Sequence, residues 1–151
     1  MAEQIKTKKA LDSLVPYKTD AINLHEYLTE RDQYETGDLL FFSGNHWLSS
    51  LIRWKSKSCW SHVGVVLKFE EMDRLFLAES ILEVGVRLVP LSYIFNSYDG
   101  NGKGYNGRVA WTKHKDLNEN GKIKLKEFCL DNLTKQYNHK EYYRILWRSI
   151  T

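Results

Sequence analysis

Residues 58–67 read SCWSHVGVVL, which places His62 at the start of a run of small and branched apolar residues. Such a run predicts a buried strand, so the imidazole would lie where the strand leaves the core. Histidine changes charge near physiological pH and can therefore transfer protons in a cleft. The same position also suits a structural histidine with a hydrogen-bonded ring. The local residues alone leave both interpretations open.

The two cysteines, Cys59 and Cys129, could supply a nucleophile, because a thiolate attacks well once a neighbouring base has taken its proton. Their spacing matches neither a metal site nor a disulfide framework, although one disulfide between them is compatible with the sequence. Cys59 precedes His62 by three residues, which places their side chains on opposite faces of a strand. Cys129 falls on the apolar face of a predicted helix, where cysteine usually belongs to the core.

A third pattern, DLNENGKIKLKE, fits the calcium-binding loop of an EF-hand. Asp116, Asn118, Asn120 and Glu127 would fill ligand positions. Two features oppose calcium binding: a predicted strand precedes the loop where an EF-hand has a helix, and lysines lie among the ligands. A polar turn that caps the next helix explains the same residues, and we regard calcium as the weaker interpretation.

The hydrophobic pattern predicts the elements that must position these side chains. Short apolar runs predict strands at 39–42, 61–67, 74–79, 85–89 and 108–112. Helical spacing appears at 11–15, 20–30, 46–54, 91–95 and 122–135. Antiparallel strands in a meander, with helices segregated from them, predict an α+β fold.

Length and composition limit the class of protein. The 151 residues suit one domain, with 1–36 as an N-terminal helical extension and 37–151 as the main domain. With 42% hydrophobic and 27% charged residues the chain is not a disordered one, and a net charge of +3 is too small to indicate nucleic-acid binding. No secretory signal and no apolar run long enough to cross a membrane are visible. We therefore expect a soluble, cytoplasmic protein.

The chain resembles the permuted branch of the NlpC/P60 papain-like superfamily in the order of six segments: GDLLFFSG, LIRWKS, WSHVGVVL, LFLAES, GVRLVPLSYI and KQYN. That branch includes the YiiX/YaeF-like bacterial proteins, poxvirus members and, more distantly, the lecithin retinol acyltransferases. The resemblance covers roughly residues 37–140. It implies a circularly permuted papain-like fold, an antiparallel sheet with packed helices.

The resemblance also implies site residues. In that branch a histidine at a strand start comes first, a polar residue at a strand end second, and a nucleophilic cysteine last. His62 would be the base and Glu79 its orienting partner, with Glu83 as the second choice for the partner. Cys129 follows both in the required order. The implied protein is a thiol hydrolase with a Cys-His-Glu site, acting on peptide or lipid-like acyl substrates without a cofactor.

The nucleophile departs from the family pattern. Family nucleophiles lie at a helix N-terminus, where backbone amides stabilise the thiolate, whereas Cys129 lies in mid-helix. LTKQYN resembles the segment before the family cysteine, but no cysteine follows it, and Ser149 lies in no nucleophile turn. Three interpretations remain. The chain lacks the nucleophile segment, or it keeps the fold as a binding or structural protein, or a rearranged helix brings Cys129 to His62.

Overall fold

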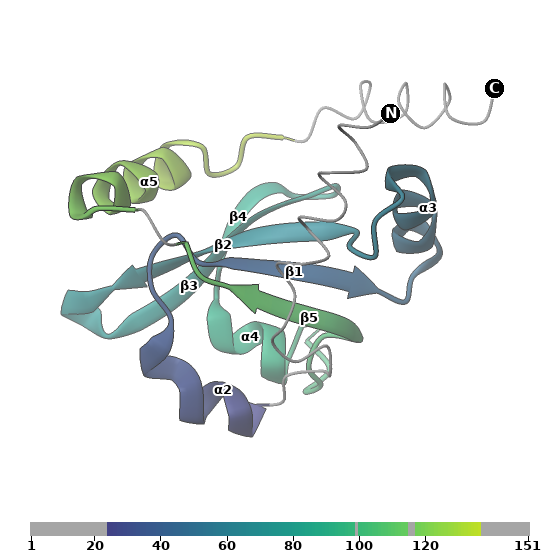
Figure 1. The fold of residues 1–151 in the computed structure, drawn as a ribbon, viewed down its shortest axis with the longest axis horizontal. Coiled ribbons are helices and arrows are strands. Elements are labelled where there is room, and N and C mark those ends of the chain that lie inside the picture. Colours follow the sequence, from purple (N-terminus) through teal and green to yellow (C-terminus); the bar gives the residue numbers. More distant parts are fainter. Residues whose placement is uncertain (1–23, 99, 115–116, 137–151) are drawn as a thin grey trace.

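The computed structural model describes residues 24–98, 100–114 and 117–136 (Figure 1). The helices are α2 (Leu24–Glu30), α3 (Trp47–Ser56), α4 (Leu91–Asn96) and α5 (Glu119–Asp131), with short 3-10 helices η1 (Arg31–Gln33) and η2 (Glu70–Met72). The strands are β1 (Leu39–Gly44), β2 (His62–Phe69), β3 (Arg74–Ile81), β4 (Gly85–Pro90) and β5 (Gly107–Thr112). The predicted helix at 11–15 lies outside the described residues.

The five strands form one antiparallel sheet in the order β4-β3-β2-β1-β5. All five predicted strands are present, and the α+β class is confirmed. Pro90 ends β4, which lies at an edge of the sheet, where a missing backbone N–H costs no ladder hydrogen bond. The last helix begins three residues earlier than its apolar spacing predicts, because the Asn118 side chain accepts a hydrogen bond from the Gly121 N–H and caps it.

Alternation along the strands divides the core between the two faces of the sheet. One face carries a large cluster into which α4 packs and to which α2 contributes Tyr27. Its buried members include Leu40, Phe42, Val66, Leu77, Leu91, Ile94 and Val109. The opposite face carries a smaller cluster in which Cys129 of α5 packs with Leu67 and Ala78. Figure 1 shows α5 on one side of the sheet and α2 and α4 on the other.

The segment before β1 belongs to the large cluster. The Tyr27 ring stacks on Phe95 at 4.9 Å, and the Tyr34 ring stacks on Trp111 at 4.2 Å. The Trp111 indole N–H donates a 2.8 Å hydrogen bond to the buried Asp38 carboxylate. Aromatic contacts therefore fix α2 and the connector to β1 against the sheet.

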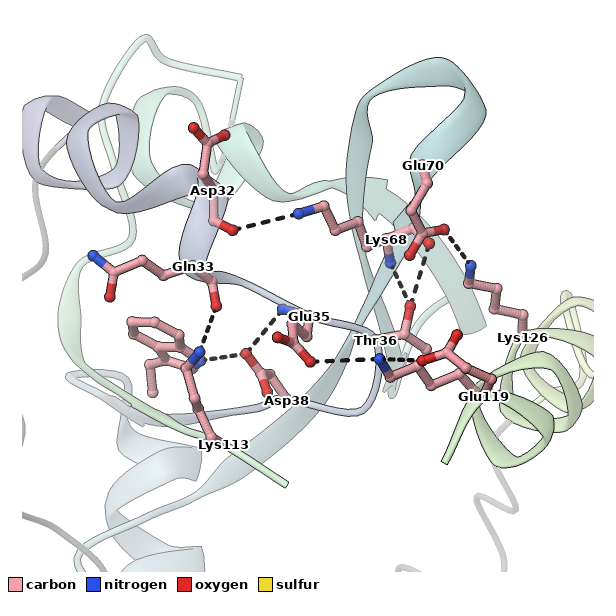
Figure 2. Close-up of polar contacts among 12 residues, drawn as sticks. Asp32, Gln33, Glu35, Thr36, Asp38, Lys68, Glu70, Lys113, Glu119 and Lys126 are labelled. Atoms are coloured by element: carbon pink, nitrogen blue, oxygen red, sulfur yellow. Dashed lines mark hydrogen bonds and ion pairs between the residues drawn. The ribbon is translucent and has the colours of Figure 1, made fainter. Parts of the chain in front are cut away.

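Polar contacts join this connector to β2, β5 and α5 at one end of the sheet (Figure 2). The Thr36 hydroxyl accepts from the Lys68 N–H at 2.9 Å and donates to the Lys68 carbonyl at 3.2 Å. Lys122 of α5 lies 3.5 Å from Glu35 of the connector, and Lys113, directly after β5, donates to the Gln33 carbonyl at 2.8 Å. The contacts with Lys68 fix the C-terminal end of β2. His62 lies at the opposite end of the same strand.

Candidate active site

The sheet register brings His62 and Glu79 together. Gly64 of β2 lies opposite Glu79 of β3, and His62 precedes Gly64 by two residues on the same face. The His62 Nε2 lies 2.7 Å from the Glu79 Oε2, within hydrogen-bond distance. The imidazole is 28% exposed, while the Glu79 side chain is completely buried. The site therefore has a buried carboxylate behind a ring that solvent can reach.

Arg87 is the residue that the sequence prediction missed. It lies opposite Glu79 in the pairing of β3 with β4, and its Nε donates a 2.8 Å hydrogen bond to the Glu79 Oε1. Each oxygen of the carboxylate thus has a cationic or potentially cationic partner. The sequence did contain a hint. A basic residue lies in the predicted strand after Glu79, and pairing of the two strands as a hairpin could place it opposite Glu79.

The partners of Glu79 set its charge. Burial alone would raise the pKa of this carboxyl, but the hydrogen bond to His62 and the Arg87 guanidinium outweigh burial and lower the pKa. Glu79 is therefore ionised at neutral pH in spite of its buried position. An ionised carboxylate at Nε2 favours the His62 tautomer that carries its proton there.

Aromatic rings surround this charged group. The His62 ring lies 5.5 Å from Phe42, and Tyr105 meets Phe42 edge-on at 5.1 Å. The Arg87 guanidinium lies 6.0 Å and 5.9 Å from the ring centres of two tyrosines, Tyr93 and Tyr98. These distances suit cation–π attraction. The rings restrict the positions that His62 and Arg87 can take.

Gly64 is required by packing beneath the site. A Cβ at this position would come within 2.7 Å of the Leu77 Cδ1 and 2.9 Å of its Cγ. Leu77 is completely buried and has little freedom to move. The absence of a side chain at Gly64 therefore allows Leu77 of β3 to pack closely against β2.

The structure does not bring Cys129 to His62. Cys129 packs with Leu67 and Ala78, on the face of the sheet opposite to the one that carries His62 and Glu79. Burial raises the pKa of this thiol, which favours the unreactive neutral form. The geometry of the described residues therefore gives no support to Cys129 as the partner of His62.

The remaining candidates also have definite places. Cys59 is partly exposed and lies between α3 and β2, and neither it nor Cys129 forms a disulfide. Glu83 is exposed between β3 and β4, so the carboxylate that reaches His62 is that of Glu79. Ser149 lies outside the described part of the chain.

The described part of the predicted calcium loop is mostly helix, which argues against the EF-hand interpretation. Asn120 and Glu127 lie in α5, and the Asn118 side chain caps that helix. A calcium loop needs these side chains to converge on one ion from extended and turn backbone, which a continuous helix does not allow. Asp116 lies outside the described residues. The Asn118 cap agrees with the polar-turn alternative.

Comparisons with known proteins agree with the fold. No family model matches the chain, and no curated protein matches it significantly. Among solved structures, the crystal structure of metalloprotein YiiX from Escherichia coli O157:H7, described as DUF1105, matches with a TM-score of 0.54 at 22% sequence identity. The chain has a YiiX-like fold. The match covers 70% of this chain and 54% of the YiiX chain, so this chain spans about half the length of YiiX.

The YiiX-like fold agrees with the resemblance to YiiX/YaeF-like proteins at the level of architecture. Both the order of the segments and the α+β sheet point to the same neighbour. A structural match at 22% identity shows a similar fold. It does not show the activity, which depends on the residues of the site.

Proposed function

We propose that this YiiX-like domain carries the general-base half of a permuted papain-like hydrolase site, which acts on an amide or ester bond. The proposal depends on the 2.7 Å contact between His62 and the completely buried Glu79. A carboxylate at one ring nitrogen fixes the tautomer and the orientation of the imidazole. Hydrolases that use a histidine base prepare the ring in this way.

The geometry suggests how a proton would move. Because Nε2 of His62 is bound to Glu79, Nδ1 is the nitrogen that would accept a proton from the nucleophile. The resulting imidazolium would be stabilised by the Glu79 carboxylate, and its proton would then pass to the leaving amine or alkoxide. Arg87 would act through Glu79, since its guanidinium keeps that carboxyl ionised.

The thiol is the open part of the proposal. For Cys129 to attack, α5 would have to leave the face of the sheet on which it packs. Cys59 lies close to His62 along the chain, in the segment that leads into β2. It lies outside the strand, so the strand alternation expected from its spacing does not fix the direction of its side chain. Substituting each cysteine separately would show which thiol, if either, attacks the substrate.

A metal-assisted reaction is not part of the proposal. YiiX is described as a metalloprotein. Within residues 24–98, 100–114 and 117–136 of this chain, no group of three or more His, Cys, Asp and Glu side chains could hold a metal ion. The Arg87 guanidinium on Glu79 would also repel a cation there. The residues at this site therefore do not fit a metal.

A binding or structural protein that keeps the fold without the chemistry is the second candidate. The observation that favours it is the position of Cys129, which is buried and lies on the face opposite His62. In that case the His62–Glu79–Arg87 group would act as a polar anchor for a bound molecule.

Hydrolysis assays would test the first proposal. The purified chain is tested with p-nitrophenyl esters of different acyl length and with fluorogenic peptide amides. We expect turnover that falls by about a hundredfold to ten-thousandfold in His62→Ala, because general-base catalysis contributes on that order. Cys59→Ser and Cys129→Ser, measured separately, would identify the thiol that is used.

His114→Ala is the matched control, because His114 is an exposed histidine beyond β5. Its turnover should equal that of the unchanged chain. Turnover that survives His62→Ala would contradict the proposed base. No turnover on any substrate, with ligand binding that His62→Ala weakens, would favour the second candidate.

A further inference from the structure

Helix α3 has an apolar surface that no other described element covers. None of its ten residues is buried, although half of them are Trp, Leu or Ile. Trp47 and Trp54 are each 68% exposed. A helix of a globular protein normally buries its apolar stripe against a neighbour. Among the described residues the stripe of α3 therefore stays uncovered, as surfaces that bind a partner do.

The tryptophans lie on the outer side of the helix. Trp47, Leu51 and Trp54 follow each other at i, i+4 and i+7, and so share one face. The opposite side holds the sheet, where the Arg53 guanidinium bonds the Gly44 carbonyl at the end of β1. Figure 1 shows α3 beyond the end of β1, apart from the helices that cover the sheet. We define Trp47, Leu51 and Trp54 as the tryptophan face.

The stretch of sequence that carries the tryptophan face contains charges of one sign only. No Asp or Glu occurs in residues 39–69, whereas Lys55 and Lys57 are exposed at the end of α3. A surface of tryptophan with neighbouring lysines complements a partner that is apolar beneath a negatively charged layer. The segment 137–151 is itself basic by sequence, with Lys140, Arg144 and Arg148 against Glu141, so charge does not favour it as the cover.

We propose that α3 docks this protein on the surface of a bilayer that contains anionic lipid. Indole rings settle at the boundary of headgroups and acyl chains, where one end of the ring is apolar and the other hydrated. Lysines beside them are attracted by the negative surface. In the described part of the chain no helix is long and apolar enough to cross a membrane, so the contact is peripheral. This inference does not depend on catalysis by His62.

Vesicle co-sedimentation would test the docking. Vesicles of phosphatidylcholine alone are compared with vesicles in which part of the lipid is phosphatidylglycerol. We expect the chain to sediment with the phosphatidylglycerol vesicles and to remain in solution with the neutral ones. Added salt should release it, because exposed charges are screened over about 10 Å at 0.1 M salt.

Matched variants assign the effect to α3. The double variant Trp47→Ser/Trp54→Ser should bind about tenfold more weakly or worse. Phe128→Ser, which removes another exposed aromatic ring (66%) from α5, should bind like the unchanged chain. Lys55→Gln should weaken binding about fivefold, the contribution of one basic residue at an anionic surface. Lys124→Gln, an exposed lysine of α5, should leave it unchanged.

Three results would overturn the proposal. The first is an absence of binding to phosphatidylglycerol vesicles. The second is equal binding by the tryptophan double variant, and the third is equal binding to neutral vesicles. The main alternative is that a second copy of this chain binds the tryptophan face. Sedimentation velocity would detect the resulting dimer. If the unchanged chain is a dimer and the tryptophan double variant is a monomer, the tryptophan face serves self-association.

Discussion

His62 acquires its environment from residues that are distant in the sequence. Glu79 comes from the next strand, and Arg87 comes from the strand after that. The prediction that Glu79 partners the histidine followed from a family resemblance, and the two side chains lie in contact. Arg87 could not be found in this way, because its contact depends on strand register.

Arg87 should control the ionisation of Glu79. In Arg87→Met the buried carboxyl loses one of the groups that lower its pKa, so the pKa should rise. Carbon-13 NMR titration of the glutamate carboxyl groups would measure it, with Glu79→Gln used to assign the signal.

Arg74→Met provides the control, because Arg74 is an exposed arginine at the start of β3, where it bonds the Asp73 carbonyl. The Glu79 titration should be unchanged in this variant. An unchanged titration in Arg87→Met itself would mean that the guanidinium has no influence on the carboxyl.

The reactivity of the two thiols tests the environments of Cys59 and Cys129. Cys129 is buried and its thiol pKa is raised, so alkylation by iodoacetamide at neutral pH should be slow. Cys59 is partly exposed and should react faster. Peptide mapping over time separates the two. Rapid alkylation of Cys129 that disappears in His62→Ala would instead indicate a pairing that this arrangement of α5 does not contain.

At the scale of elements, the start of α5 decided between two interpretations of the same residues. The spacing of DLNENGKIKLKE fits a calcium loop, yet the chain forms a helix from Glu119 onward. The outcome depends on Asn118, whose side chain satisfies a backbone N–H at the helix start. Ligand spacing alone could not distinguish a cap from a coordination site.

Removing the cap should weaken the fold by a small, specific amount. Asn118→Ala is expected to lower the free energy of unfolding by about 1 kcal/mol, measured by urea denaturation. Asn120→Ala is the control, since it alters another residue of the same motif without removing a cap and alanine is a good helix former. Calcium should not raise the melting temperature of either protein. A calcium-dependent increase that both variants reduce would restore the EF-hand.

The connector between α2 and β1 contains a buried polar group without a partner. The Tyr34 hydroxyl has no hydrogen bond within the described residues, and the ring is completely buried. Tyr34→Phe should therefore increase the free energy of unfolding by about 1 kcal/mol. Tyr27→Phe is the contrasting variant, because Tyr27 bonds Arg31 and its loss should destabilise the protein. A destabilised Tyr34→Phe would mean that the hydroxyl has a partner.

At the scale of the whole molecule, the sheet separates two environments. The face covered by α2 and α4 carries the charged group of His62, Glu79 and Arg87 at one end. The face covered by α5 carries Cys129 in an apolar cluster. This division, rather than any local feature, keeps the buried thiol away from the imidazole.

Acid should destabilise the molecule. Glu79 and Glu70 have lowered pKa values in the fold, through His62 and Arg87 for Glu79 and through Lys126 for Glu70. Their stabilisation is complete above the ordinary glutamate pKa of about 4.3 and is lost as pH falls through the lowered values. Asp38 acts in the opposite direction, because burial raises its pKa.

Urea denaturation at a series of pH values measures this effect. Glu79→Gln should be less stable at neutral pH and should lose less stability on acidification, because the titrating group is gone. Its curve should meet that of the unchanged chain at low pH. An equally steep loss in the variant would assign acid unfolding to other groups.

Hydrophobic periodicity and turn residues act locally, and they predicted the five strands, the helices within the described range and the α+β class. The resemblance of the segments to a known family then pointed to His62 and Glu79. Three features became visible in the folded chain alone: Arg87 completes the charged group, Cys129 lies on the other face, and the tryptophan face of α3 is exposed. These facts depend on strand register and on which helix covers which face. Both are set by packing between residues far apart in the chain, and no local pattern records that packing.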